Sequence, residues 1–225
     1  MSRFIHEPAV LSYADLPTVN DNGRRMYCTP EGERFPSITT VLGASGKESI
    51  KAWRDRIGHD EADRIARLAA ARGTGMHNIS EKYVRGDVDF MTRSTMPHYA
   101  SLFNAIRPVI DANLEKVYAQ ETPLYSKYLK VAGRVDLVGK YRGKNSVIDF
   151  KTASKPKLKE WIINYFQQAS FYAIAFEECT GIPIPQIVII MAVDGSPTPI
   201  EFVERRNNYT DGLIATINNY YSLYA

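Results

Sequence analysis

Two acidic residues and a lysine lie inside apolar segments that have the composition of β-strands. Asp136 occurs in VAGRVDLVGKY, and Asp149 and Lys151 occur in NSVIDFKTA. Acids are disfavoured in strands, and an unpaired carboxylate in a protein interior is costly, so these side chains need a chemical reason to be there. Carboxylate oxygens bind hard cations such as Mg²⁺ or Mn²⁺. A nearby ammonium could assist a water activated by such an ion to hydrolyse a phosphate ester.

The turn in the sequence RGKN decides whether these side chains meet. Side chains alternate across a strand, so Asp149 and Lys151 share one face. In an antiparallel hairpin, a two-residue turn pairs Asp136 with Asp149, and a four-residue turn pairs it with Lys151. A three-residue turn would place it opposite Phe150 and break the site. The alternative is an internal Asp–Lys ion pair, with the other acid facing solvent.

Two further pairs of polar residues have helical spacing. His77 and Glu81 are four residues apart, hence on one face of a helix, and both are suitable ligands for a cation. Gln168 and Tyr172 are also four residues apart, on an otherwise apolar stripe. The alternative is that the first pair lies on the surface and that Tyr172 packs in the core.

Hydrophobic periodicity predicts the elements that position these residues. Strands are expected at 118–125, 128–141, 144–152, 186–193 and 199–203. Helices are expected at 47–72 with a break at Gly58, from an N-cap at Thr74 to Val84, at 96–116, through 158–176 with Gly181 as its end, and near the C-terminus. Residues 1–36 have little periodicity and are expected to be irregular or a short hairpin.

This order of elements predicts an α/β fold with a central mixed sheet flanked by helices. We expect a single domain over 1–225, with a mainly helical N-terminal portion at 1–116 and a sheet-containing catalytic core at 117–225.

Composition and charge restrict the partners. The net charge is only +3, but ten Lys or Arg residues occur with three acids between Lys127 and Glu160, a surface that would suit a phosphate-rich polymer. The alternative, which charge alone favours, is a solvated lysine-rich face. The two cysteines match no metal-binding spacing, which argues against an iron–sulfur cluster. The most apolar run, 187–193, is too short to cross a bilayer, so no membrane partner is expected.

In order along the chain, four motifs resemble the RecB-like branch of the PD-(D/E)XK nuclease superfamily. They are GTGMH at 73–77 with Glu81, GRVD at 133–136, DFK at 149–151 and QASFY at 168–172. Within that branch, PSITTVL, KAWRDRIG and VIDFKTASKPK are similar to mitochondrial genome maintenance exonucleases and related phage exonucleases.

The resemblance implies a restriction-endonuclease-like core and a role for each motif residue. Asp136, Asp149 and the backbone carbonyl of Phe150 would bind the metal with His77, and Glu81 would bind it or hold its water. Lys151 would be the catalytic lysine. The residues expected to contact DNA are Gln168, Tyr172, Arg134 and Lys155.

The implied activity is a Mg²⁺- or Mn²⁺-dependent DNA exonuclease acting on single-stranded ends. The alternatives are a structure-specific or restriction-type endonuclease of the same fold, and a catalytically inactive DNA-binding accessory protein. No mitochondrial transit peptide is recognised at the N-terminus, so the expected location is the cytoplasm of a bacterium or of a phage-infected host.

Overall fold

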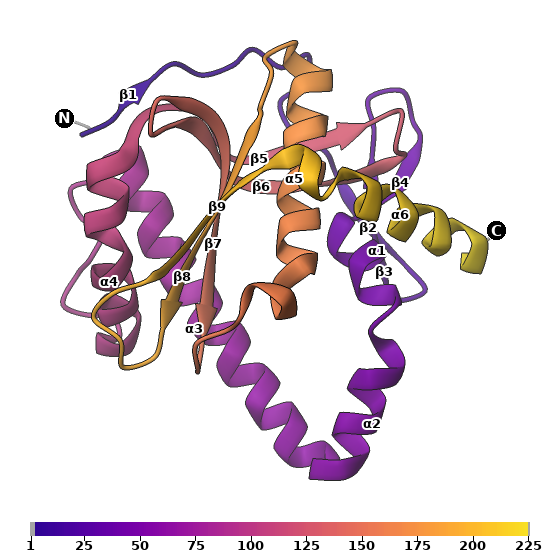
Figure 1. Cartoon of the computed structure of the whole chain (residues 1–225), viewed down its shortest axis with the longest axis horizontal. Helices are drawn as coiled ribbons and strands as arrows, with labels where there is room; N and C mark the ends of the chain where they lie inside the picture. The colour runs from indigo at the N-terminus through magenta and orange to yellow at the C-terminus, as the bar shows by residue number, and fades with distance from the viewer. Residues whose placement is uncertain (1–2, 225) are drawn as a thin grey trace.

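A six-stranded mixed sheet forms the centre of the molecule in the computed structural model, which describes residues 3–224 (Figure 1). The strand order is β1-β5-β6-β7-β8-β9. β5, β6 and β7 are antiparallel neighbours, β8 runs parallel to β7, and β9 closes one edge antiparallel to β8. The bounds are β1 Ile5–His6, β5 Leu114–Ser126, β6 Val131–Tyr141, β7 Lys144–Ala153, β8 Gln186–Val193 and β9 Ile200–Arg205.

Helices cover both faces of this sheet, which confirms the predicted α/β class. α5 (Ile163–Thr180) packs on one face, with α1 (Ile38–Ala44) and α6 (Thr210–Tyr224) against it. α3 (His59–Arg85) and α4 (Pro97–Asn113) cover the other face. Because both faces are covered, every residue of β8 is buried, in agreement with its apolar sequence from 187 to 193.

The hairpin between β6 and β7 has the two-residue turn that would bring the two acids together. Arg142 and Gly143 form this turn, and both have positive φ, as a type I′ turn requires. The strand pairing that starts at this turn ends with Leu137 opposite Ile148. The next position of the same register would place Asp136 opposite Asp149.

The expected helix start at Thr74 is wrong, because α3 continues without interruption from His59 to Arg85. Its glycines accommodate a neighbour and do not break the helix. A Cβ atom at Gly75 would lie 2.2 Å from the ring of Tyr99 on α4, so only glycine allows this close approach. The break at Gly58 and the helix end at Gly86 are both observed.

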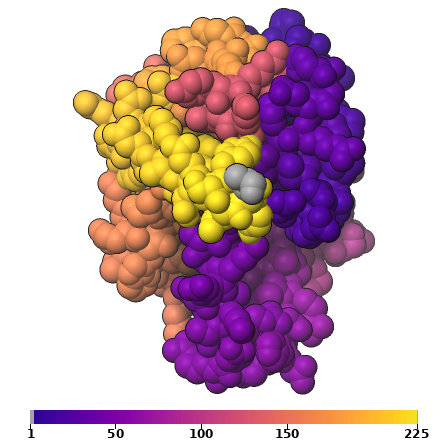
Figure 2. Space-filling view, turned by 90° about the vertical axis from the view of Figure 1, so that its right-hand side faces the viewer, coloured from indigo at the N-terminus to yellow at the C-terminus, as the bar shows by residue number. Residues whose placement is uncertain are grey.

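The N-terminal segment holds more β-structure than its sequence indicates. β2 (Thr18–Asp21), β3 (Arg24–Cys28) and β4 (Arg34–Pro36) form a three-stranded sheet, and β1 pairs with β5. α2 (Lys47–Ile57) has no buried residue, and the hairpin of α2 and α3 projects from one end of the molecule (Figures 1 and 2). Within residues 3–224, no helix combines the length and apolarity that crossing a bilayer requires.

Candidate metal centre

The central part of the candidate site is a group of three side chains from three elements. His77 of α3, Glu121 of β5 and Asp136 of β6 each offer a ligand atom, and these atoms all lie within 4.8 Å of one another. Two carboxylates and an imidazole at this spacing form a suitable donor set for a divalent cation.

His77 is oriented by the end of the β6–β7 pairing. Its Nε2 lies 2.7 Å from the carbonyl oxygen of Phe150, and its Nδ1 lies 3.4 Å from Oδ2 of Asp136. With the proton on Nε2, the ring donates to the carbonyl and its Nδ1 lone pair faces Asp136. Such a second hydrogen bond is the usual way in which a metal-binding histidine is held.

The side chain of Asp136 links β6 to β7 beyond the last backbone pair of the hairpin. Its Oδ2 accepts a hydrogen bond of 2.9 Å from the backbone N–H of Phe150, just beyond the last paired residues of the hairpin. The carboxylate therefore connects β6 and β7 where their backbone pairing has ended, and the same oxygen faces Nδ1 of His77.

Glu121 is the member of this group that the sequence analysis missed. The register on either side, Gln120 with Leu137 and Thr122 with Val135, places it directly across from Asp136. Its φ of 46° is left-handed, which is rare for a non-glycine residue and unfavourable within a strand. Burial, followed by the charge of Asp136, raises the pKa of Glu121 to about 7.

Asp149 and Lys151 lie beside this group on β7. Asp149 is only 1% exposed, and its Oδ2 is 2.5 Å from Nζ of Lys151. Neither of its oxygens has a hydrogen bond of normal geometry within the described part of the chain. Burial raises the pKa of Asp149 to about 6, because it outweighs the attraction of Lys151. A buried carboxylate whose oxygens lack hydrogen bonds is a suitable ligand for a cation.

Lys151 remains a cation in this environment. Burial opposes its charge, but the carboxylates of Asp149 and Asp136 outweigh burial and raise its pKa. Its Nζ also lies 3.4 Å from Oε1 of Gln168, and 5.1 Å from the ring centre of Tyr165 on α5.

Glu81 is near the group but is paired elsewhere. Its Oε1 lies 2.9 Å from Nη1 of Arg85, one turn further along α3. Its backbone carbonyl accepts a hydrogen bond from the side chain of Gln120, which neighbours Glu121. Glu81 therefore lies outside the set of three converging ligand atoms.

The residues expected to contact DNA differ in their exposure to solvent. Tyr172 is only 2% exposed and occupies the space that a side chain at Gly133 would take, so we correct its DNA-binding role to a positioning one. Gln168 lies between Lys151 and the hydroxyl of Tyr172.

Arg134 stays a prediction as a DNA contact. Its guanidinium donates to the backbone carbonyl of Glu121, which holds the left-handed peptide in place, and to the carboxylate of Asp15, and its side chain is 40% exposed. Lys155 is exposed as well, beyond the end of β7.

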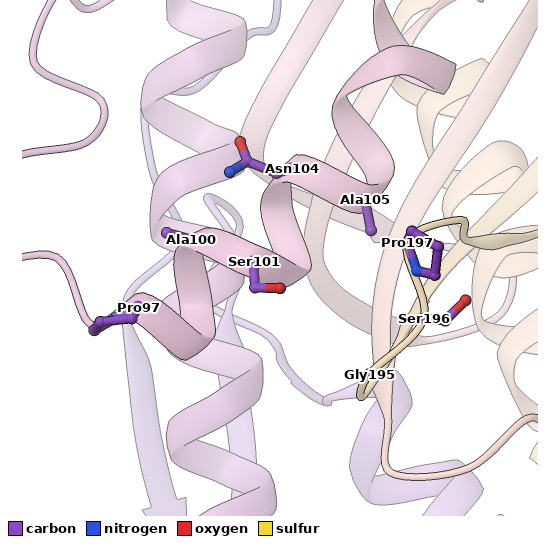
Figure 3. A pocket seen from close by; sticks show the side chains of 8 residues that line it. All are labelled: Pro97, Ala100, Ser101, Asn104, Ala105, Gly195, Ser196 and Pro197. Carbon is purple, nitrogen blue, oxygen red and sulfur yellow. The ribbon is translucent and has the colours of Figure 1, made fainter.

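A pocket of about 600 Å³ lies between α4 and the turn that joins β8 to β9 (Figure 3). Side chains such as Ser101, Asn104 and Pro197 line it, and none of its lining residues is charged. The acidic group lies elsewhere, so this pocket is not the candidate metal centre.

Comparison with known proteins gives two curated relatives, both named mitochondrial genome maintenance exonuclease 1. The protein of Mus musculus is 24% identical over 182 residues, and that of Homo sapiens is 21% identical over 208 residues. These matches cover 76% and 85% of this chain, but only 53% and 59% of the relatives. The chain thus spans little more than half of their length.

A crystal structure of SSO0001 is similar with a TM-score of 0.47 at 13% identity, covering 83% of this chain and 74% of the other. The sequence model of the PD-(D/E)XK nuclease superfamily matches residues 44–199, more than half of the chain, and this range includes His77, Glu121, Asp136 and Asp149. The chain therefore belongs to the PD-(D/E)XK nuclease superfamily.

Proposed function

We propose that this protein is a metal-dependent DNA exonuclease that hydrolyses phosphodiester bonds at single-stranded ends. The observation that carries the proposal is the convergence of His77, Glu121 and Asp136 beside a buried Asp149–Lys151 pair. Both curated relatives are named exonucleases, which supports the end-dependent form of the reaction.

The residues present fit a divalent cation. His77, Glu121 and Asp136 would hold it, with Asp149 as a further oxygen donor. The carbonyl of Phe150, which was also expected as a ligand, instead accepts from Nε2 of His77 on the opposite side of the ring. The donor set of oxygens and one imidazole suits either Mg²⁺ or Mn²⁺. When bound, such an ion lowers the pKa of a water molecule and neutralises charge on the phosphate.

The remaining residues have roles that follow from their contacts. Hydrolysis forms a bond from a water oxygen to phosphorus and breaks the bond from phosphorus to one sugar oxygen, which leaves with a proton. Lys151, held as a cation by two carboxylates, would stabilise the negative charge that develops on the phosphoryl oxygens. Gln168 and Tyr172 would position Lys151, and Glu81 would order water near the ligands.

The proposal is tested with end-labelled single-stranded DNA and a circular single strand of the same composition, each with Mg²⁺, Mn²⁺ or EDTA. We expect metal-dependent shortening of the linear strand from an end and an intact circle. Asp149→Ala and Lys151→Ala should both abolish shortening. Equal cleavage by the wild type and both variants would refute the assignment.

The same assay separates the alternatives. Cleavage of the circle would identify an endonuclease of the same fold. Binding without cleavage in either metal would identify a DNA-binding accessory protein.

A further inference from the structure

Large apolar side chains are exposed to solvent on the connection between β7 and α5 and at the start of α5. Trp161 is 67% exposed, and Leu158 and Ile163 are also exposed. Ile162 and Phe166 are completely buried, so they anchor the start of the helix and fix the outward direction of Trp161. Single exposed apolar residues are common, but three within six positions, one of them a tryptophan, indicate a contact surface.

Part of the positive charge that ion pairs leave unneutralised lies on the same connection. Of the ten basic residues between Lys127 and Glu160, five form ion pairs with acids outside that segment. They are Lys127 with Glu31, Arg134 with Asp15, Lys140 with Glu115, Arg142 with Glu201, and Lys159 with Glu204.

Lys155 and Lys157, by contrast, have no acidic partner among residues 3–224. Folding has thus neutralised much of the basic segment and left this charge beside Trp161.

This surface is connected to the catalytic lysine through one aromatic ring. Nζ of Lys157 lies 5.2 Å from the ring centre of Tyr165 and donates a hydrogen bond of 3.0 Å to its hydroxyl. Nζ of Lys151 lies 5.1 Å from the centre of the same ring. Trp161 lies four residues before Tyr165, in the 3₁₀ turn that leads into α5. The exposed tryptophan is therefore within about one turn of the ring that both lysines contact.

We propose that Lys155, Lys157 and Trp161 bind the DNA strand next to the phosphate that is cleaved. The lysines contact the backbone, and Trp161 stacks on an unpaired base. This inference rests on the proposed function and adds a source for its single-strand preference. A base inside a duplex is already stacked on both faces, whereas an unpaired base has a free face for an aromatic ring. The lysines complement phosphates, which favours nucleic acid over an apolar protein segment as the occupant.

Tryptophan fluorescence can test this stacking directly. The chain has two tryptophans, so Trp53→Phe leaves Trp161 as the only one. This variant is titrated in EDTA, which prevents cleavage, with an oligothymidylate and with an oligomer of the same length built of abasic sites. We expect the oligothymidylate to quench the emission of Trp161 and the abasic oligomer to leave it unchanged.

Binding affinities provide the second readout. Loss of one stacked base is expected to weaken binding roughly 5- to 150-fold, so Trp161→Ala should lose that much affinity for oligothymidylate. Its affinity for the abasic oligomer should stay unchanged, and Trp161→Phe should recover most of the loss.

Tyr128→Ala is the matched control. Tyr128 is 83% exposed and lies between Lys127 and Lys130, in the turn between β5 and β6. It therefore has the same aromatic and basic composition at a different place. We expect this variant to bind oligothymidylate as the wild type does.

The inference is overturned if neither oligomer quenches Trp161, or if Tyr128→Ala and Trp161→Ala weaken binding equally. Failure of the proposed function is distinguishable, since it would appear as absence of cleavage in Mg²⁺ and Mn²⁺. Quenching without cleavage would refute the nuclease proposal and leave the stacking surface intact. Cleavage without quenching would refute the stacking surface and leave the nuclease proposal intact.

Discussion

Replacing Glu121 by Gln tests the arrangement of the site, because the structure and the sequence motifs select different glutamates. The motif spacing indicates Glu81, whereas the converging ligand atoms include Glu121. Glutamine keeps the size of the side chain and removes its charge. We therefore compare Glu121→Gln with Glu81→Gln, whose native carboxylate is paired with Arg85.

The expected effect on metal binding can be estimated from linkage. A ligand at 100 times its dissociation constant stabilises a protein by about 2.7 kcal/mol. Changing even the outer partners of metal ligands costs 10- to 100-fold in affinity, so loss of Glu121 itself should cost about 100-fold. At the same metal concentration, the stabilisation would then fall to about 0.4 kcal/mol. For a chain of this length, that difference corresponds to about 5–9 °C in Tm.

The assay is thermal unfolding with and without Mn²⁺ in the absence of DNA. Glu121→Gln should lose most of the metal-induced rise in Tm, and Glu81→Gln should keep it. Without metal, Glu121→Gln should be at least as stable as the wild type at pH 8, because a buried carboxylate facing Asp136 has been neutralised. A full metal-induced rise in Glu121→Gln, or its loss in Glu81→Gln instead, would show that we have chosen the wrong acid.

Three further predictions follow from the site and its supports. Gly75→Ala should lower Tm, because its Cβ would lie 2.2 Å from the Tyr99 ring. Gly73→Ala is the control: the nearest atom to its Cβ is 3.9 Å away, so it should be neutral or stabilising by up to about 1 kcal/mol. Equal Tm values for the two variants would contradict this packing. The raised pKa values of Glu121 (about 7) and Asp149 (about 6) mean that the folded state holds protons that the unfolded state has lost, so metal-free stability should fall as the pH rises from about 4 through 7. Metal affinity, measured by calorimetry, should show the opposite trend and weaken below about pH 7; a flat profile from pH 5 to 8 would exclude these carboxylates as ligands. In chemical denaturation at pH 8, Lys151→Met should destabilise the metal-free protein by about 3–5 kcal/mol, because it leaves Asp149 buried without a cation. Lys151→Arg should recover part of that loss. An unchanged denaturation midpoint for Lys151→Met would mean that the ion pair contributes nothing to stability.

The sequence allowed the main strands and the proximity of the two acids to be predicted, because strand periodicity and turn length are local; the roles of the motif residues stay predictions. The bounds expected for β7 and β8 agree with the structure to within one residue, and the hairpin turn is one of the two that keep the acids together. His77, which the resemblance to the nuclease superfamily assigned to the metal site, faces Asp136.

Glu121 was missed because its role depends on pairing between strands and on a left-handed residue, and neither is a local property. A signal was present, however. With Ser126 opposite Val131, the register of the β5–β6 hairpin places Glu121 across from Asp136. The same turn-counting that was applied to β6 and β7 would have found it.

The errors in the helices have a similar origin. Thr74 indicated an N-cap and hence a helix boundary, but the helix continues there, and the neighbouring Gly75 is required by the ring of Tyr99, which comes from another helix. Trp161 falls within the helix expected through 158–176, yet it lies in a 3₁₀ turn, Lys159–Ile162, that precedes α5, and it is exposed.

The place where β6 and β7 diverge gives Asp136 two duties that no single assay can separate. It completes the backbone hydrogen bonding at the fork by accepting from Phe150, and it contributes an oxygen to the ligand group. Glu121 has no such part in closing the fork. A descendant of this protein that drifted away from catalysis could discard that side chain first, while the fork would still require an acceptor at position 136.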